Sequence, residues 1–129
     1  MRILIADDNP VDRDTLREAL RDRGVEVVEV STPPDAMAAL DGGGIDAAFV
    51  DMLMPYCVPD DSEPLNGRDV ARKASSLSIR VFAVTSLLFL VPAGIPSVMK
   101  GEPGFRNLVR RAAGLPMNTP TRGVERLAL

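Results

Sequence analysis

The chain has no histidine and no tryptophan, and it has only one cysteine among its 129 residues. The lack of histidine excludes Ser-His-Asp and Cys-His catalysis, disfavours zinc and haem sites, and excludes a phosphohistidine carrier. The single cysteine, Cys57, has no partner for a disulfide within the chain, which favours a reducing compartment and a cytoplasmic location. Carboxylates, hydroxyls and lysines are left for chemistry, and these groups suit hard cations and phosphate.

Strong charge and long apolar segments are also missing. The net charge is -3, so we expect no direct nucleic-acid binding through bulk electrostatics. The adjacent Arg110 and Arg111 are only a pair, which we expect on a solvated helix face. The apolar stretch Ile3–Ala6 at the N-terminus is too short for a signal peptide. The longest apolar run, Val81–Gly94, is interrupted by hydroxyl residues and a proline, so we expect no membrane insertion.

Short apolar runs alternate with helical patterns along the chain. Strands are predicted at residues 2–6, 25–30, 47–50, 80–84 and 95–99, and helices at residues 10–23, 32–40, 67–75 and 105–113. Asn9-Pro10 and Thr32-Pro33 have the pattern of an N-cap followed by proline, and Gly24 suits the position after a helix end. This alternation predicts an α/β fold, with helices on both faces of a parallel sheet.

The remaining segments are less regular. A long acidic, proline-rich loop is predicted at residues 52–66, one or two helical turns at 87–91, and a C-terminal tail from residue 114. Residues 1–113 are then one domain, which agrees with the length of the chain.

Five polar side chains come just after the ends of predicted strands. They are Asp7, Asp8, Asp51, Thr85 and Lys100. The carboxyl edge of an open α/β sheet is where ligands bind, so we expect these side chains to meet in one crevice. Taken singly, Thr85 fits an ordinary strand residue and Lys100 a solvated charge, and it is the set of five that favours a functional site.

Three clustered carboxylates repel one another, which raises their pKa values, and a divalent cation relieves the repulsion. Oxygen ligands favour Mg²⁺. A carboxylate beside such an ion is a nucleophile toward phosphorus, and a lysine and a hydroxyl stabilise the transferred group. The cluster therefore indicates phosphoryl transfer to an aspartate.

Several segments resemble the receiver domain of bacterial two-component response regulators, and together they span residues 1 to 113. They are ILIADDNP at 3–10, AFVDMLMP at 48–55, NGRDVA at 66–71, VFAVTS at 81–86 and AG...VMK at 93–100. The resemblance implies a flavodoxin-like, doubly wound sheet of five parallel strands in the order 2-1-3-4-5. It also implies a two-component or phosphorelay partner, a histidine kinase or phosphotransfer protein, that donates the phosphoryl group.

The resemblance assigns a role to each residue of the site. It implies that Asp51 is the phosphoacceptor, that Asp8 ligates Mg²⁺ directly, and that Asp7 does so through water. The main-chain carbonyl of Leu53 is a further implied ligand of the ion. Thr85 is implied to sense the phosphoryl group, and Lys100 to pair with it.

The chain departs from the family pattern in four places. The segment from Asp51 to Gly67 is longer than in the family, and the segment from Thr85 to Lys100 is shorter, so the fourth helix is expected to be shortened or missing. Ser97 stands where an aromatic is usual, and the residue after the lysine is glycine instead of proline. We therefore expect no switch that couples threonine to an aromatic side chain.

The leading hypothesis is an atypical, stand-alone phosphoacceptor, and two alternatives are weighed against it. One is a receiver-like interaction or dimerisation module whose output does not depend on phosphorylation. The apolar run Leu87–Val91 either forms such an interface, with a possible homodimer, or folds inward over the sheet. An aspartyl-phosphate phosphatase is disfavoured, because Leu53 occupies the position of the second aspartate and no histidine replaces it. The chain is therefore expected not to be an enzyme.

Overall fold

The computed structural model describes residues 1–54, 65–86 and 90–117. Five strands form one parallel sheet in the order β2-β1-β3-β4-β5. The elements are β1 Arg2–Ala6, α1 Pro10–Ala19, β2 Glu26–Val30, α2 Pro33–Asp41, β3 Ala47–Asp51, α3 Gly67–Ser76, β4 Arg80–Thr85, β5 Ser97–Met99 and α4 Phe105–Ala113. The flavodoxin-like fold and its strand order are thus confirmed.

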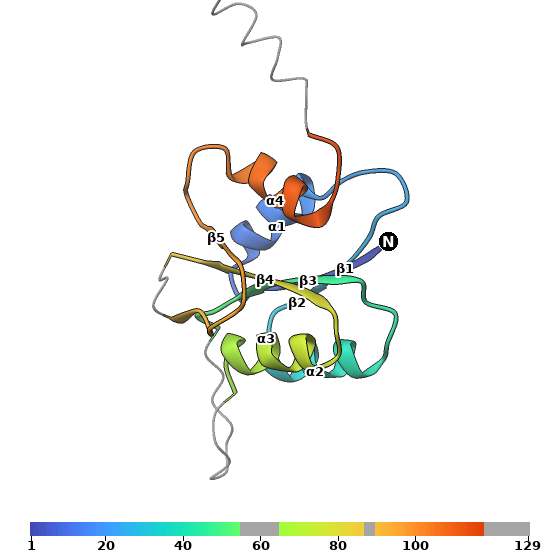
Figure 1. Cartoon of the computed structure of the whole chain (residues 1–129), viewed down its shortest axis with the longest axis vertical. Helices are drawn as coiled ribbons and strands as arrows, with labels where there is room; N and C mark the ends of the chain where they lie inside the picture. Colours follow the sequence, from blue (N-terminus) through green and yellow to red (C-terminus); the bar gives the residue numbers. More distant parts are fainter. Residues whose placement is uncertain (55–64, 87–89, 118–129) are drawn as a thin grey trace, which may run out of the picture.

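Helices cover both faces of the sheet, with α1 and α4 on one face and α2 and α3 on the other (Figure 1). Alternate residues of β1 point to opposite faces, so Ile3 and Ile5 join the core beneath α1 and α4, while Leu4 and Ala6 join the core beneath α2 and α3. Every residue of β3 is buried, because this strand lies in the middle of the sheet. The site residues at its end are therefore held on a rigid support.

The predicted helix starts are confirmed by their capping bonds. The side chain of Asn9 accepts hydrogen bonds from the N–H groups of Val11 and Asp12, and that of Thr32 accepts one from Asp35. At α3, Asn66 and Asp69 form a reciprocal capping box. These side chains satisfy N–H groups that a helix start otherwise leaves unpaired.

The predicted end of the first helix was wrong. We expected it to reach Arg23 with Gly24 behind it, but α1 ends at Ala19 and Gly24 lies in the turn before β2. The guanidinium of Arg110 donates hydrogen bonds to the main-chain oxygens of Ala19 and Arg21, at 3.0 and 2.9 Å. These bonds occupy carbonyls at the end of α1 and hold the chain in its turn away from the helix.

Arg110 itself also contradicts its prediction. Its side chain is buried, whereas the neighbouring Arg111 is exposed as expected. The helix face that carries Arg110 packs toward α1, where main-chain carbonyls take the place of water as its partners. The prediction failed because those partners carry no mark in the sequence.

The last strand is shorter than predicted. We expected β5 over residues 95–99, but it covers Ser97–Met99. Pro96 has no N–H for the hydrogen-bond ladder, although its carbonyl accepts from the Ala83 N–H at 2.8 Å.

The described residues between β4 and β5 contain no α-helix, as the short spacing predicted. Leu90, Val91 and Ile95 pack against the core on the α2 and α3 face and cover the sheet there. Leu87, Leu88 and Phe89 lie outside the described residues, so the choice between interface and core for these three stays a prediction. Most of the predicted 52–66 loop, residues 55–64, also lies outside them.

The predicted tail begins where α4 ends at Ala113. Leu115 packs against the core beneath α1 and α4, and the carbonyl of Pro116 accepts a hydrogen bond from Arg110 at 2.6 Å. Residues 118–129 lie outside the described part. None of the described helices has the length and apolar composition that a membrane span requires.

Candidate functional site

The sheet brings the predicted site residues to one edge. Asp7 follows β1, Asp51 and Thr85 end β3 and β4, and Lys100 follows β5. Because these strands are parallel, their carboxyl ends meet at the same edge, and the Lys100 N–H donates to the Thr85 carbonyl at 3.0 Å. Thr85 is buried at this edge. The predicted site residues therefore meet at the carboxyl edge of the sheet, as their positions after the strands predicted.

Three carboxylates gather at its centre. Asp7, Asp8 and Asp51 each offer one oxygen, and these oxygens lie within 4.8 Å of one another. Asp7 is fully buried and Asp51 is 5% exposed, while Asp8 is open to solvent. Main-chain N–H groups fix the two buried side chains, since Asn9 donates to Asp7 Oδ1 at 2.9 Å and Leu53 donates to Asp51 Oδ1 at 3.1 Å.

The ammonium of Lys100 lies among carboxylate oxygens of three aspartates, two from this cluster and one from α1. Its Nζ is 3.0 Å from Asp7 Oδ2, 3.3 Å from Asp51 Oδ2 and 2.8 Å from Asp12 Oδ2. Burial disfavours the charged form of Lys100, but the three carboxylates outweigh burial, so the pKa of this side chain is raised. Lys100 is therefore a fixed positive charge in the site, and the alternative of a solvated surface lysine, considered for this residue taken singly, does not apply to it.

Asp51 shows the opposite electrostatic balance. Burial, followed by the repulsion from Asp7, raises the pKa of Asp51 to about 7, although Lys100 acts in the other direction. The raised pKa agrees with the expectation from clustered carboxylates. A cation that enters the cluster would stabilise the ionised form of Asp51 and so lower its pKa.

The donor atoms fit a hard divalent cation. Asp7 Oδ2 is buried and receives no well-directed hydrogen bond from the described residues, although it lies close to Lys100. The group offers oxygen ligands only, which is the preference of Mg²⁺. Asp7, Asp8 and Asp51 would hold the ion, and the Leu53 carbonyl stays a predicted further ligand.

Sequence reasoning missed two residues of the site. Asp12, in the first turn of α1, contacts Lys100, and its place four residues after Asp8 was the available signal. Gly67 begins α3, and a Cβ at this position would overlap the main-chain oxygen of Asp51. A glycine at a helix start, directly after the Asn66 cap, was the signal for such a close approach.

The fold and this edge together define an α/β domain with an acidic cluster and a lysine at the carboxyl ends of its strands. The model of the response regulator receiver domain family matches residues 3–85. The chain belongs to this family and is a receiver domain of two-component signalling. No curated protein of similar sequence was found.

Solved receiver domains have the same fold. A CheY-like receiver domain protein from Methanospirillum hungatei is 22% identical, with a TM-score of 0.64, over 88% of this chain and 90% of that one. The receiver domain of NtrX from Brucella abortus is 18% identical, with a TM-score of 0.66, over 88% of this chain and 99% of that one. The phosphorylated cyanobacterial phytochrome response regulator RcpA is 21% identical, with a TM-score of 0.64, over 88% and 89%.

Proposed function

We propose that this receiver domain accepts a phosphoryl group on Asp51, with Mg²⁺ held by Asp7, Asp8 and Asp51. The donor is a phosphohistidine on a histidine kinase or phosphotransfer protein. One observation carries the proposal: Asp51 is a buried carboxylate between an acidic cluster and a lysine 3.3 Å away, at the ligand-binding edge of the sheet. The lone cysteine supports a reducing, cytoplasmic location as part of the same proposal.

The residues of the site suit this reaction. A carboxylate oxygen of Asp51 attacks phosphorus, the phosphorus–nitrogen bond of the donor breaks, and its electron pair stays on the imidazole nitrogen. The Lys100 ammonium neutralises charge on the transferred group, and Thr85 at the neighbouring strand end supplies a hydroxyl donor. A bound Mg²⁺ adds further positive charge beside the same oxygens.

The proposal is a phosphoacceptor and not a phosphatase. Leu53, two residues past the acceptor, is an apolar and 55% exposed side chain that has no proton to give or take. A module that acts independently of phosphorylation is not favoured, because the carboxylates and the lysine of the site are all present and in contact.

Replacement of Asp51 tests the acceptor. Asp51→Asn keeps the side-chain shape and removes the nucleophilic carboxylate. We expect wild type to gain the mass of one phosphoryl group from acetyl phosphate with Mg²⁺, and Asp51→Asn to gain none, by intact mass spectrometry. Asp35→Asn, at an exposed acid in α2, is the control and should behave as wild type. A phosphoryl mass on Asp51→Asn would show that the acceptor lies elsewhere.

Replacement of Asp8 tests the metal site. Mg²⁺ retains several waters when few carboxylates hold it, so we expect weak binding that still stabilises wild type. At a concentration ten times Kd the gain is about 1.4 kcal/mol, and Asp8→Asn should lose most of it in thermal melts with and without Mg²⁺. The metal-free Asp8→Asn protein should melt higher than metal-free wild type, because one repelling charge is gone. Equal stabilisation of both proteins by Mg²⁺ would argue against a site at this cluster.

A further inference from the structure

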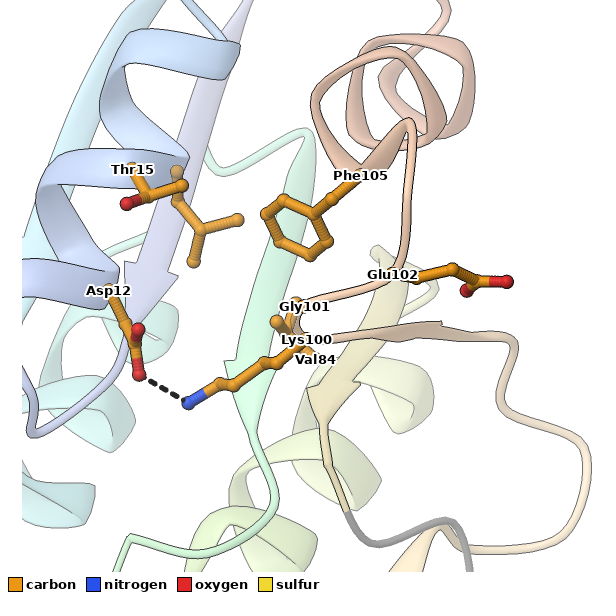
Figure 2. Close-up of a pocket in the computed structure, with 8 residues that line it drawn as sticks. Asp12, Thr15, Val84, Lys100, Gly101, Glu102 and Phe105 are labelled. Atoms are coloured by element: carbon orange, nitrogen blue, oxygen red, sulfur yellow. Dashed lines mark hydrogen bonds and ion pairs between the residues drawn. The ribbon is translucent and has the colours of Figure 1, made fainter.

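Asp12 has a contact that the proposed phosphoryl transfer does not use. Its Oδ2 atom lies 2.8 Å from Lys100 Nζ, which is shorter than the contacts of the same ammonium with Asp7 and Asp51. Figure 2 shows the Lys100 side chain extending to Asp12 at the start of α1. The contact thus joins the first turn of α1 to the residue that follows β5, 88 positions further along the chain.

The number of donors on Lys100 limits how many anions it serves. An ammonium has three N–H donors, and three carboxylates already surround this one. A phosphoryl group on Asp51 brings new anionic oxygens to the same ammonium, so an existing partner has to withdraw.

Asp12 is the partner that leaves at the smallest cost. Asp7 is fully buried, and its other oxygen is held by the Asn9 N–H, so it has no route to water. Asp51 carries the phosphoryl group itself. The Asp12 side chain is 36% exposed, and its carboxylate reaches solvent by a side-chain rotation.

We propose that Asp12 is a releasable counter-ion of Lys100, which it holds in the unphosphorylated domain and gives up to the phosphoryl group on Asp51. The inference rests on the proposed function. Asp12 acts through Lys100 and is therefore a positioning residue, whose negative charge opposes the arrival of the phosphoryl group.

The release changes the surface next to the site. Asp12 and Lys100 line one cavity of about 300 Å³, together with Thr15 of α1 and Gly101 and Phe105 beyond β5 (Figure 2). Residues 100–104 include two glycines with left-handed backbone, Gly101 at φ 76° and Gly104 at φ 77°. When Asp12 releases Lys100, the 100–104 segment loses a polar link to α1 and becomes more mobile. This change of surface does not depend on an aromatic side chain at position 97, where this chain has Ser97.

The test compares wild type with Asp12→Asn and a matched control, Asp14→Asn. Asp14 is an exposed acid on the same helix that pairs with Arg17, so both variants lose one negative charge from α1. The first measurement is the affinity for beryllofluoride with Mg²⁺, which mimics the phosphoryl group, by calorimetric titration. The second is hydrogen–deuterium exchange of the 100–104 segment, with and without beryllofluoride.

We expect Asp12→Asn to bind beryllofluoride about three- to tenfold more tightly than wild type, as for the loss of a partly exposed competing charge, and Asp14→Asn to bind as wild type. We expect beryllofluoride to speed exchange of the 100–104 segment in wild type, and Asp12→Asn to exchange rapidly without it. Equal or weaker binding by Asp12→Asn, or exchange in wild type that beryllofluoride leaves unchanged, would overturn the release while phosphorylation of Asp51 stands. Absence of binding in all three proteins, with no phosphoryl mass gained from acetyl phosphate, would overturn the proposed function and the release together.

Discussion

At the scale of a single residue, the reaction and the surroundings of Asp51 favour opposite protonation states of its carboxyl group. The reaction needs it ionised as a nucleophile, but burial and the neighbouring Asp7 raise its pKa to about 7 in the metal-free protein. This conflict is resolved when positive charge enters the cluster, because a cation favours the ionised form. The acidic cluster therefore costs stability when it is empty, and occupation of the site relieves that cost.

The metal-free protein should show this cost as a pH dependence. The pKa of Asp51 is about 7 in the folded domain and 3.8 in an unperturbed chain, so between these values the folded state binds the proton and the unfolded state does not. The stabilisation from Asp51 is thus fully present below pH 3.8 and is lost as the pH rises through about 7. We expect the free energy of unfolding of wild type, in a chelator, to fall relative to Asp51→Asn by at most about 1.4 kcal/mol per pH unit across this window.

Urea denaturation of both proteins measures this difference when it is repeated at steps of about one pH unit from about pH 4 to about pH 8. The comparison cancels other titrating groups that the two proteins share. A constant difference across the range would show that the pKa of Asp51 is not raised. Saturating Mg²⁺ should reduce or reverse the trend, because the ion favours the ionised carboxylate.

At the scale of elements, the start of α3 decides how the acceptor strand ends. Gly67 is buried against the main chain of Asp51 and Met52, and an added Cβ would overlap the Asp51 carbonyl oxygen. The capping box of Asn66 and Asp69 fixes the first turn of the helix there. α3 and the end of β3 therefore share one rigid geometry, which sets the position of the Asp51 side chain.

Gly67→Ala should disturb that geometry. The added methyl forces the backbone of Asp51 or of α3 to shift, so we expect a loss of about 1–3 kcal/mol in the free energy of unfolding and slower phosphorylation by acetyl phosphate. Gly42→Ala is the control, because Gly42 has right-handed backbone and a Cβ there meets only ordinary contacts of 3.5 Å or more. Full stability and an unchanged phosphorylation rate in Gly67→Ala would show that α3 does not position the acceptor.

At the scale of the whole molecule, Arg110 connects segments that are distant in the sequence. Its guanidinium donates to the carbonyls of Ala19, Arg21 and Pro116, and it lies 3.5 Å from the Asp22 carboxylate. These partners end α1 and hold the chain just after α4, so one buried side chain fixes how both helices lie on the same face of the sheet. The role of the buried Arg110 side chain is therefore structural.

Arg110→Met tests this connection. The change keeps much of the apolar stem and removes the donors, so buried carbonyls lose charged partners, and we expect a loss of about 2–3 kcal/mol in the free energy of unfolding by urea denaturation. Arg111→Met, at the exposed neighbour on the same helix, should stay within about 0.5 kcal/mol of wild type. Equal effects of the two changes would show that the contacts of Arg110 add nothing beyond those of a surface arginine.

The sequence by itself determined the features that depend on nearby residues. The Asn9 and Thr32 caps, the prolines that follow them and the apolar strands are local signals, and they were enough to predict the parallel sheet. The acidic pair after β1, Asp51 after β3 and Lys100 after β5 were found because parallel strands bring their carboxyl ends together. That rule turns a position in the sequence into a position in space.

Only the tertiary structure decided the contacts between distant segments. The end of α1 depends on Arg110, which lies far along the chain and binds main-chain carbonyls that every residue has. The contact of Lys100 with Asp12 joins residues 88 positions apart, and neither its 2.8 Å distance nor the exposure of Asp12 can be read from the sequence. Local propensities fix where elements begin, but the choice among chemically equivalent partners is made by packing, because packing alone sets which of them water can still reach.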